Sequence, residues 1–412
     1  MKSLFTKFML ALLLTACAQQ ITLAQVTGCN TSRYLTNVFP SATKTTVQFG
    51  QNINTSGFQQ TFYMDIYQPT GDTAQKRPTI IFAHGGSFIF GTRDDMAATC
   101  LDFAKKGYVT ATIDYRLWNI LSGTPDSFQM LDVVAKTLGD MKASVRHLRL
   151  DAYTTNTFRI DTNNIFVGGL SAGAITALHV AMMGPNDSIA PYLKSKIVAN
   201  GGWEGSTGNA ANATHSSKVR GVVSLSGALY RKEIMDSNDP PFIAIQGTAD
   251  AIVPFNRGLA AGIITMEGSN LMDQRATAVG VSHHFTAVPG GGHTDIYDLP
   301  QFSTSLTSFY LNGLLFLKNL MCNPTAIDET QPFDSQIAIY PNPSGAAMVF
   351  DLKTEHPCDV FLYDMMGRCV KNVQQVSGTL TLEKSEIGSG TFIAHFIAQN
   401  KTTSTSRKII FE

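Results

Sequence analysis

The chain has 412 residues, 44% of them hydrophobic, which is enough for two or three domains with packed cores. Its 31 basic residues (Lys and Arg) balance its 31 acidic residues (Asp and Glu), so the net charge is zero. No basic stripe or polybasic segment interrupts this balance. The composition therefore argues against a nucleic-acid-binding protein and against attachment to a membrane through charge.

Residues 1–18 are typical of a secretory signal peptide. Two lysines precede the apolar run 8–14, which is too short to span a bilayer stably. Two forms of processing fit the sequence. Residues 16–18 match the cleavage rule that releases a soluble chain, and residues 14–17 resemble a lipobox that would leave Cys17 lipidated. Because of the C-terminal features described below, we expect release of a secreted or cell-surface protein that is exported through the periplasm.

From residue 45 to residue 320 the chain alternates apolar strand patterns with helical patterns, the spacing of a doubly wound, mostly parallel sheet. The first two strands alternate in polarity and predict an antiparallel hairpin. The predicted strands are 45–49, 62–67, 78–83, 108–114, 165–168, 219–225, 241–246 and 284–289, and the predicted helices are 131–150, 174–180 and 303–320.

A glycine turn follows the third predicted strand, with the sequence His-Gly-Gly-Ser-Phe at 84–88. Hydrolysis of an ester passes through a tetrahedral oxyanion, which needs preorganised N–H donors about 3 Å away. Glycine leaves backbone amides open to such an oxygen because no side chain blocks the approach. We assign the amides of Gly86 and Ser87 to an oxyanion hole.

The sequence Gly-Leu-Ser-Ala-Gly at 169–173 lies between a predicted strand and a predicted helix. This is the pattern of a nucleophile elbow, in which glycines flank a serine held in a strained turn. We expect Ser171 to be the nucleophile and the amide of Ala172 to be a third oxyanion donor.

A serine needs a base, and the base needs a carboxylate that fixes its tautomer. Asp250 follows the strand at 241–246 on a glycine turn, and His293 ends a Gly-Gly-Gly run after the last strand. We expect Asp250 to be the acid and His293, on a flexible loop, to be the base. Their order along the chain, serine then acid then histidine, is the one that this type of sheet requires.

These motifs resemble those of the α/β-hydrolase superfamily, on the carboxylesterase–lipase side that carries His-Gly-Gly-x-Phe and Gly-x-Ser-Ala-Gly. The resemblance implies a catalytic domain over residues 25–322 and includes secreted bacterial esterases, some of which act on acetylated or feruloylated plant polysaccharides. Leu170, Ser87 and Ala174 depart from common forms of the motifs, which leaves the subfamily and the substrate open.

The segment 200–217 is rich in Gly, Ser and Asn and lies where this fold often carries a cap insertion. Its single tryptophan, Trp203, has two interpretations: it lines an acyl or sugar pocket, or it packs the segment onto the core. No long apolar cap is present, which argues against a lipase for long-chain fats.

A polar, proline-punctuated linker is predicted at 323–334, and short alternating strands follow at 335–412. We expect a small antiparallel β-sandwich there. Its Tyr-Pro-Asn-Pro, Tyr-Asp-x-x-Gly-Arg, Gly-x-Gly-Thr-Phe and terminal Arg-Lys-Ile-Ile sequences resemble the C-terminal sorting domain of type IX secretion in Bacteroidetes, which implies the secretion machinery as a partner. A carbohydrate-binding module is the alternative. Cys358 and Cys369 could form a bridge, although the sequence does not determine the pairing.

The sequence thus predicts an exported serine carboxylic-ester hydrolase with a Ser-His-Asp triad, acting on short-chain or carbohydrate-linked esters. No phosphate-binding loop and no metal-ligand spacing is present, so we expect no cofactor and no metal. The alternatives are a secreted serine peptidase of the same fold and a non-catalytic surface adhesin on a hydrolase scaffold.

Overall fold

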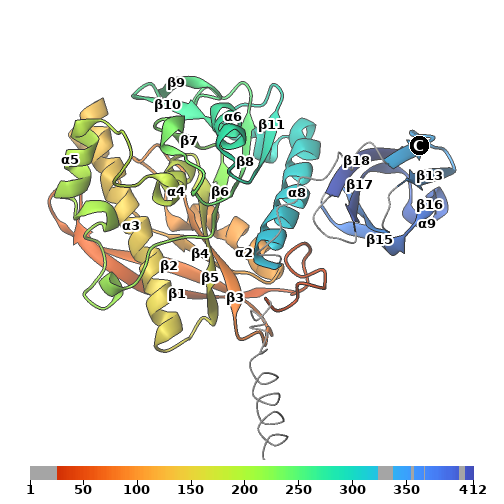
Figure 1. Ribbon diagram of the computed structural model, residues 1–412, viewed down its shortest axis with the longest axis horizontal. Helices are drawn as coiled ribbons and strands as arrows, with labels where there is room; N and C mark the ends of the chain where they lie inside the picture. The colour runs from red at the N-terminus through yellow and green to blue at the C-terminus, as the bar shows by residue number, and fades with distance from the viewer. Residues whose placement is uncertain (1–25, 323–336, 354–356, 366, 399–403) are drawn as a thin grey trace, which may run out of the picture.

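A computed structural model of the chain describes residues 26–322, 337–353, 357–365, 367–398 and 404–412 (Figure 1). The predicted signal peptide at 1–18, the lipidation candidate Cys17 and the predicted linker at 323–334 lie outside the described residues.

The larger part of the chain is built on a sheet of eight strands (Figure 1). The first two strands are antiparallel to their neighbours and the other six run parallel. The buried parallel strands read as continuous apolar runs because helices cover both faces of the sheet. Across the sheet the order is β1 (Ala42–Ile53), β2 (Gln59–Pro69), β4 (Val109–Ile113), β3 (Arg77–Ala83), β5 (Ile160–Leu170), β6 (Gly221–Leu225), β8 (Phe242–Gly247) and β11 (His283–Val288).

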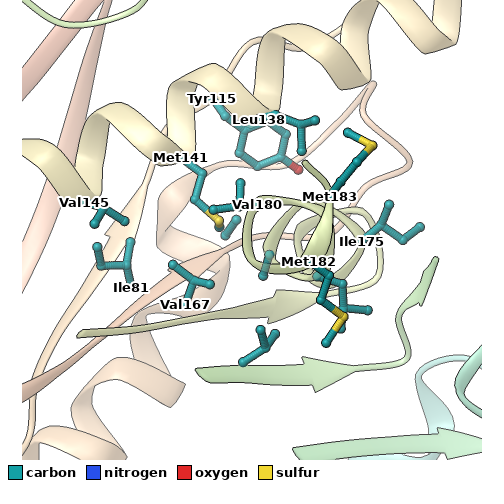
Figure 2. Close-up of a cluster of buried hydrophobic side chains, with 14 of the residues drawn as sticks. Ile81, Tyr115, Leu138, Met141, Val145, Val167, Ile175, Val180, Met182 and Met183 are labelled. Carbon is teal, nitrogen blue, oxygen red and sulfur yellow. The ribbon is translucent and has the colours of Figure 1, made fainter. Parts of the chain in front are cut away.

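Helices pack on both faces of the sheet and form two apolar cores. The first core joins α3 and α4 to one face, and Figure 2 shows Met141 and Val145 of α3 next to the strand residues Ile81 and Val167. The second core joins α2 and α8 to the other face. The helices are α2 (Ala97–Lys105), α3 (Ser127–Tyr153), α4 (Ala172–Met182), α5 (Pro191–Ala199), α6 (Ser269–Val279), α7 (Asp295–Asp298) and α8 (Ser303–Cys322), with short 3₁₀ turns η1 (Arg93–Met96), η2 (Ile120–Ser122), η3 (Gly202–Glu204), η4 (Asn212–Thr214), η5 (Lys232–Ile234) and η6 (Pro300–Phe302).

Local sequence explains where the longest helix begins. Asp126 caps α3 by accepting a hydrogen bond from the amide of Gln129, and the Gln129 side chain accepts one from the Asp126 amide. This reciprocal capping box satisfies two amides that the first turn would otherwise leave without partners. The helix is longer than the predicted 131–150 because this start signal precedes the apolar stripe.

A second, small sheet was not predicted. It has three strands in the order β7 (Ala228–Leu229), β10 (Ile264–Gly268) and β9 (Arg257–Ala260). The last two strands form a hairpin, residues 257–268, that is inserted between β8 and α6. Strands of only four and five residues, each containing a glycine, give too short a pattern to stand out in the sequence.

The C-terminal part contains two antiparallel sheets, as expected for a small β-sandwich, and the predicted α/β fold followed by antiparallel sheets is confirmed. The four-residue helix α9 was not predicted. One sheet has the order β12 (Ile337–Tyr340), β13 (Ala347–Leu352), β16 (Gly378–Glu383), the other β15 (Cys369–Val376), β14 (Cys358–Asp364), β17 (Gly390–Ala398), β18 (Ser404–Phe411), and α9 spans Lys384–Ile387.

One disulfide joins the two ends of the larger domain. It joins Cys29 to Cys322, two residues that are 293 positions apart in the sequence. Cys358 and Cys369 are not joined to each other, because the antiparallel register pairs Cys369 with Tyr363 and leaves Cys358 at the opposite end of the ladder. Five residues of strand, about 17 Å, separate the two ends.

Candidate active site

Ser171 occupies the single residue between β5 and α4, with φ 55° and ψ −118°. A side chain in this left-handed region costs about 1–3 kcal/mol, which the surrounding packing must offset. A Cβ atom at Gly169 would lie 2.5 Å from the carbonyl oxygen of Ala83, and one at Gly173 would lie 2.0 Å from the same oxygen. The two flanking glycines are therefore required for the close approach of β3 to the turn.

Three side chains from distant parts of the sequence form one hydrogen-bonded chain. Nε2 of His293 lies 2.9 Å from Oγ of Ser171, and Nδ1 of His293 lies 2.8 Å from Oδ2 of Asp250. An ionised carboxylate can only accept, so the proton of the neutral imidazole sits on Nδ1 and donates to Asp250. Nε2 is then left as the acceptor of the Ser171 hydroxyl proton.

The Asp250 side chain is fully buried yet held in its charged form. Burial raises the pKa of this carboxyl, but the hydrogen bond from His293 and the amides of Val253 and Ile252 outweigh it, and the pKa lies below its ordinary value. Both amides donate to Oδ1 at 2.9 Å. The carboxylate is thus ready to orient an imidazole and to stabilise it when it becomes positively charged.

Gln246, a fully buried glutamine on β8, supports the acid. Its Nε2 donates to Oδ2 of Asp250 at 3.2 Å and to the carbonyl of Val253 at 2.9 Å, while its Oε1 accepts from the amide of Ser269 at 2.9 Å. A single amide side chain therefore ties the acid loop to the start of α6. In the sequence this residue is only the last position of an apolar strand, so nothing marked it as part of the site.

The loop that carries His293 was expected to be flexible, but the structure shows it fixed at several points. The Ser226 hydroxyl donates to the carbonyl of His293 at 2.9 Å and lies 2.7 Å from the hydroxyl of Tyr297. The amide of Ala249 donates to the carbonyl of Gly291 at 2.9 Å, which joins the histidine loop to the acid loop. These hydrogen bonds hold the loop in the position that places the imidazole next to Ser171.

The glycine turn after β3 adopts a run of left-handed backbone angles, with φ 108° at Gly86, 56° at Ser87 and 62° at Phe88. A Cβ atom at Gly86 would lie 2.2 Å from the carbonyl oxygen of Phe90, so only glycine fits there. Tyr115 steadies the turn by donating from its hydroxyl to the carbonyl of His84 at 2.8 Å. No motif in the sequence marks Tyr115 for this role.

The three predicted oxyanion donors have no acceptor within the described part of the protein. The amides of Gly86, Ser87 and Ala172 make no backbone or side-chain hydrogen bond there. Ser87 and Ala172 line the same cavity as Ser171, whereas Gly86 is not among the lining residues. Two of the three predicted donors therefore lie on the same cavity as the predicted nucleophile, and Gly86 lies one residue before Ser87 in the turn.

A cavity of about 60 Å³ opens beside Ser171. Its walls are apolar side chains of α3, α4, the segment 252–253 and the β9–β10 hairpin. Trp203 is not among the lining residues; it packs against the first core, which favours the second interpretation of this residue. Among the described residues no group of three or more His, Cys, Asp or Glu side chains is arranged to hold a metal ion.

The strand order and the position of the serine after the fifth strand are those of the α/β hydrolases, and the protein is a serine esterase of that class. Residues 64–230 match the family described as BD-FAE, the bifunctional feruloyl/acetyl esterases. Residues 338–412 match the family described as Secretion system C-terminal sorting domain. The first match is to a family of esterases, and the second implies a secreted or cell-surface protein.

Several solved structures of esterase 2 from Thermogutta terrifontis are similar to this chain. Its apo form is 19% identical, with a TM-score of 0.47, and covers 68% of this chain and 96% of its own. The butyrate-bound form is 18% identical with a TM-score of 0.49 (70% and 97% covered), and the form phosphorylated by paraoxon is 20% identical with a TM-score of 0.45 (68% and 96% covered). No curated protein matches the chain in sequence. No helix in the described residues is long and apolar enough to cross a membrane.

Proposed function

We propose that this esterase works through a Ser171–His293–Asp250 triad and a covalent acyl-enzyme, on short-chain or carbohydrate-linked esters. The observation that carries the proposal is the unbroken hydrogen-bond chain from the Ser171 hydroxyl through the imidazole to a buried carboxylate, at the mouth of an apolar cavity.

In the first half of the reaction, Oγ of Ser171 attacks the ester carbonyl carbon as Nε2 of His293 takes the hydroxyl proton. The negative charge that develops on the carbonyl oxygen is met by the amides of Ser87 and Ala172, with Gly86 as the third donor. Each such donor is worth about 10²–10³ in turnover. The imidazolium then returns its proton to the alcohol oxygen as the ester bond breaks and the alcohol leaves.

In the second half, water takes the place of the alcohol. His293 removes a proton from the water, the resulting hydroxide attacks the acyl carbon, and Ser171 leaves with the proton that His293 returns. Asp250 keeps the imidazole in the tautomer that both steps need. Neither half of the reaction uses a metal ion or a cofactor.

The test is a panel of p-nitrophenyl esters from acetate to palmitate, run beside acetylated xylan and methyl ferulate. We expect turnover of the short esters, release of acetate or ferulate from the carbohydrate-linked ones, and a loss of about 10⁴-fold or more for Ser171→Ala. Faster hydrolysis of peptide amides than of esters would favour the peptidase alternative. Unchanged turnover in Ser171→Ala would refute the proposed nucleophile.

We also infer that the C-terminal domain serves export and not catalysis, because no proposed site residue lies beyond His293. Figure 1 shows α8 next to the C-terminal sheets. Leu311 and Leu315 of α8 pack there on an apolar patch formed by β14 and β17. A chain ending at Ala326 should keep its turnover on soluble esters and, in a bacterium with the secretion system, stay in the periplasm. Because truncation exposes the two leucines, we expect the truncated chain to be less soluble. Replacing both leucines by serine should restore the solubility. A selective loss of activity on insoluble polysaccharide would instead indicate a substrate-binding tail.

A further inference from the structure

The unpredicted β9–β10 hairpin forms one wall of the cavity beside Ser171. Ala260, Ile263, Ile264 and Met266 of this element line the cavity, whereas Leu259 points outward and is 56% exposed. The strand register pairs Ala260 with Ile264, so both lie on the inward face of the hairpin. The hairpin is joined to the acid loop, since the amide of Ala261 donates to the carbonyl of Ile252 at 2.7 Å.

The opposite wall is one face of α4. The lining residues Ser171, Ile175, His179 and Met183 are spaced four apart, so they follow one another along the helix. With a rise of about 1.5 Å per residue, His179 lies about 12 Å along the axis from Ser171. The cavity therefore runs away from the nucleophile along α4, between this helix and the hairpin.

No charged side chain lines the cavity, and apart from Ser87, Ser171, His179 and Tyr230 its lining side chains are apolar. His179 has both ring nitrogens paired, since its Nδ1 donates to the carbonyl of Ile175 at 2.7 Å and its Nε2 accepts from the amide of Tyr230 at 2.9 Å. Burial lowers the pKa of His179 to about 4, so the ring is neutral at pH 7. The cavity therefore favours an uncharged, largely apolar ligand group.

An ester has two sides, and the chemistry selects the one that enters the cavity. The acyl group stays bonded to Ser171 through the acyl-enzyme step, so it can occupy an inner space, whereas the alcohol has to leave before water attacks. An alcohol carried by a polymer has to remain outside. The cavity is therefore suited to the acyl group.

We propose that the β9–β10 hairpin sets the acyl-chain length of this esterase, and that the preferred acyl group is an uncharged, apolar chain. This inference rests on the proposed function. The cavity is small, at about 60 Å³, and the hairpin forms one of its walls, so the inward side chains of the hairpin decide how long an acyl chain fits.

Two variants of the full-length protein test the wall in opposite directions, with kcat/KM measured on p-nitrophenyl esters from acetate to octanoate. Ala260→Leu adds carbon atoms on the inward face and should lower the butyrate-to-acetate ratio by at least about tenfold. Ile263→Ala removes carbon atoms and should move the preferred chain to longer acids. Leu259→Ala, on the outward face of the same strand, is the matched control and should leave the profile unchanged.

The outcomes separate this inference from the proposed function. No ester turnover by the wild-type protein at any chain length would refute the proposed function itself. Turnover with the same chain-length profile in both inward variants, or an equal shift in Leu259→Ala, would refute only the role of the hairpin. If Ala260→Leu does not fold, as judged by circular dichroism, the profile of Ile263→Ala decides. When naphthyl esters replace p-nitrophenyl esters, each variant should shift the chain-length profile by the same amount. A shift that depends on the alcohol would place the alcohol in the cavity and refute the assignment to the acyl group.

Discussion

Gln246→Met tests whether one buried amide holds the acid loop in place. Methionine is similar in size and apolar, so the change removes hydrogen bonds without leaving a large hole. It leaves the amide of Ser269 and the carbonyl of Val253 without the partners that they have at 2.9 Å, in surroundings where Gln246 is 0% exposed. A buried polar group that loses its partner costs about 1–3 kcal/mol.

The two groups together should therefore lower the free energy of unfolding by about 2–6 kcal/mol. For a domain of this size, each kcal/mol shifts Tm by about 2–4 °C, so Tm should fall by at least about 4 °C. Turnover of p-nitrophenyl butyrate at 25 °C should fall by no more than about tenfold, because Asp250 keeps its hydrogen bonds to His293 and to two amides.

The control is Gln75→Met, in which an exposed glutamine of a surface loop is replaced and neither quantity should change. An unchanged Tm for Gln246→Met would show that the amide does not bind these loops together. A loss of turnover as large as that of Asp250→Asn would show that Gln246 acts directly on the acid and not through loop stability.

Three further outcomes follow from the structure. Asp250→Asn should lower kcat by about 10³–10⁴ without unfolding the protein, because a neutral amide no longer fixes the imidazole tautomer; steady-state kinetics with circular dichroism checks this, and near-normal kcat would reassign the acid. Burial, with Asp236 nearby, raises the pKa of Asp239 from 3.8 to about 7, so the unfolded chain loses this proton first and stability falls as pH rises through that range. The Tm of Asp239→Asn relative to the wild-type protein should therefore rise between pH 4 and pH 7. An equal difference in Tm at both pH values would contradict the raised pKa of Asp239. Replacing Cys29 and Cys322 by serine should cost about 2–5 kcal/mol in urea unfolding with unchanged kcat at 25 °C, whereas identical unfolding curves would mean that the bridge adds nothing.

The sequence predicted those parts of the site that depend on local backbone geometry. The elbow around Ser171 and the turn at Gly86 are short segments that need their glycines, because a Cβ atom at these positions would lie only 2.0–2.5 Å from a neighbouring carbonyl oxygen. Strand ends next to glycine turns also located Asp250 and His293, which the structure brings together, although their catalytic roles stay predictions.

The parts that were missed depend on contacts between distant segments. Gln246 and Ser226 act through side chains that meet loops elsewhere in the sequence, and neither has a neighbouring motif. The β9–β10 hairpin pairs four residues with four and is stabilised by the core beneath it, so its own pattern is weak. The pairing of Cys29 with Cys322 depends on the whole fold between them.

The central claim is that Ser171 carries the acyl group, and mass spectrometry of a trapped covalent adduct tests it most directly. The intact protein, treated with one equivalent of a fluorophosphonate, should gain a single adduct, and peptide mapping should place it on Ser171. The Ser171→Ala protein should gain none, and the adduct should form far more slowly in His293→Ala because the hydroxyl keeps its proton. An adduct on another residue, in a Ser171→Ala protein that still hydrolyses esters, would contradict the account.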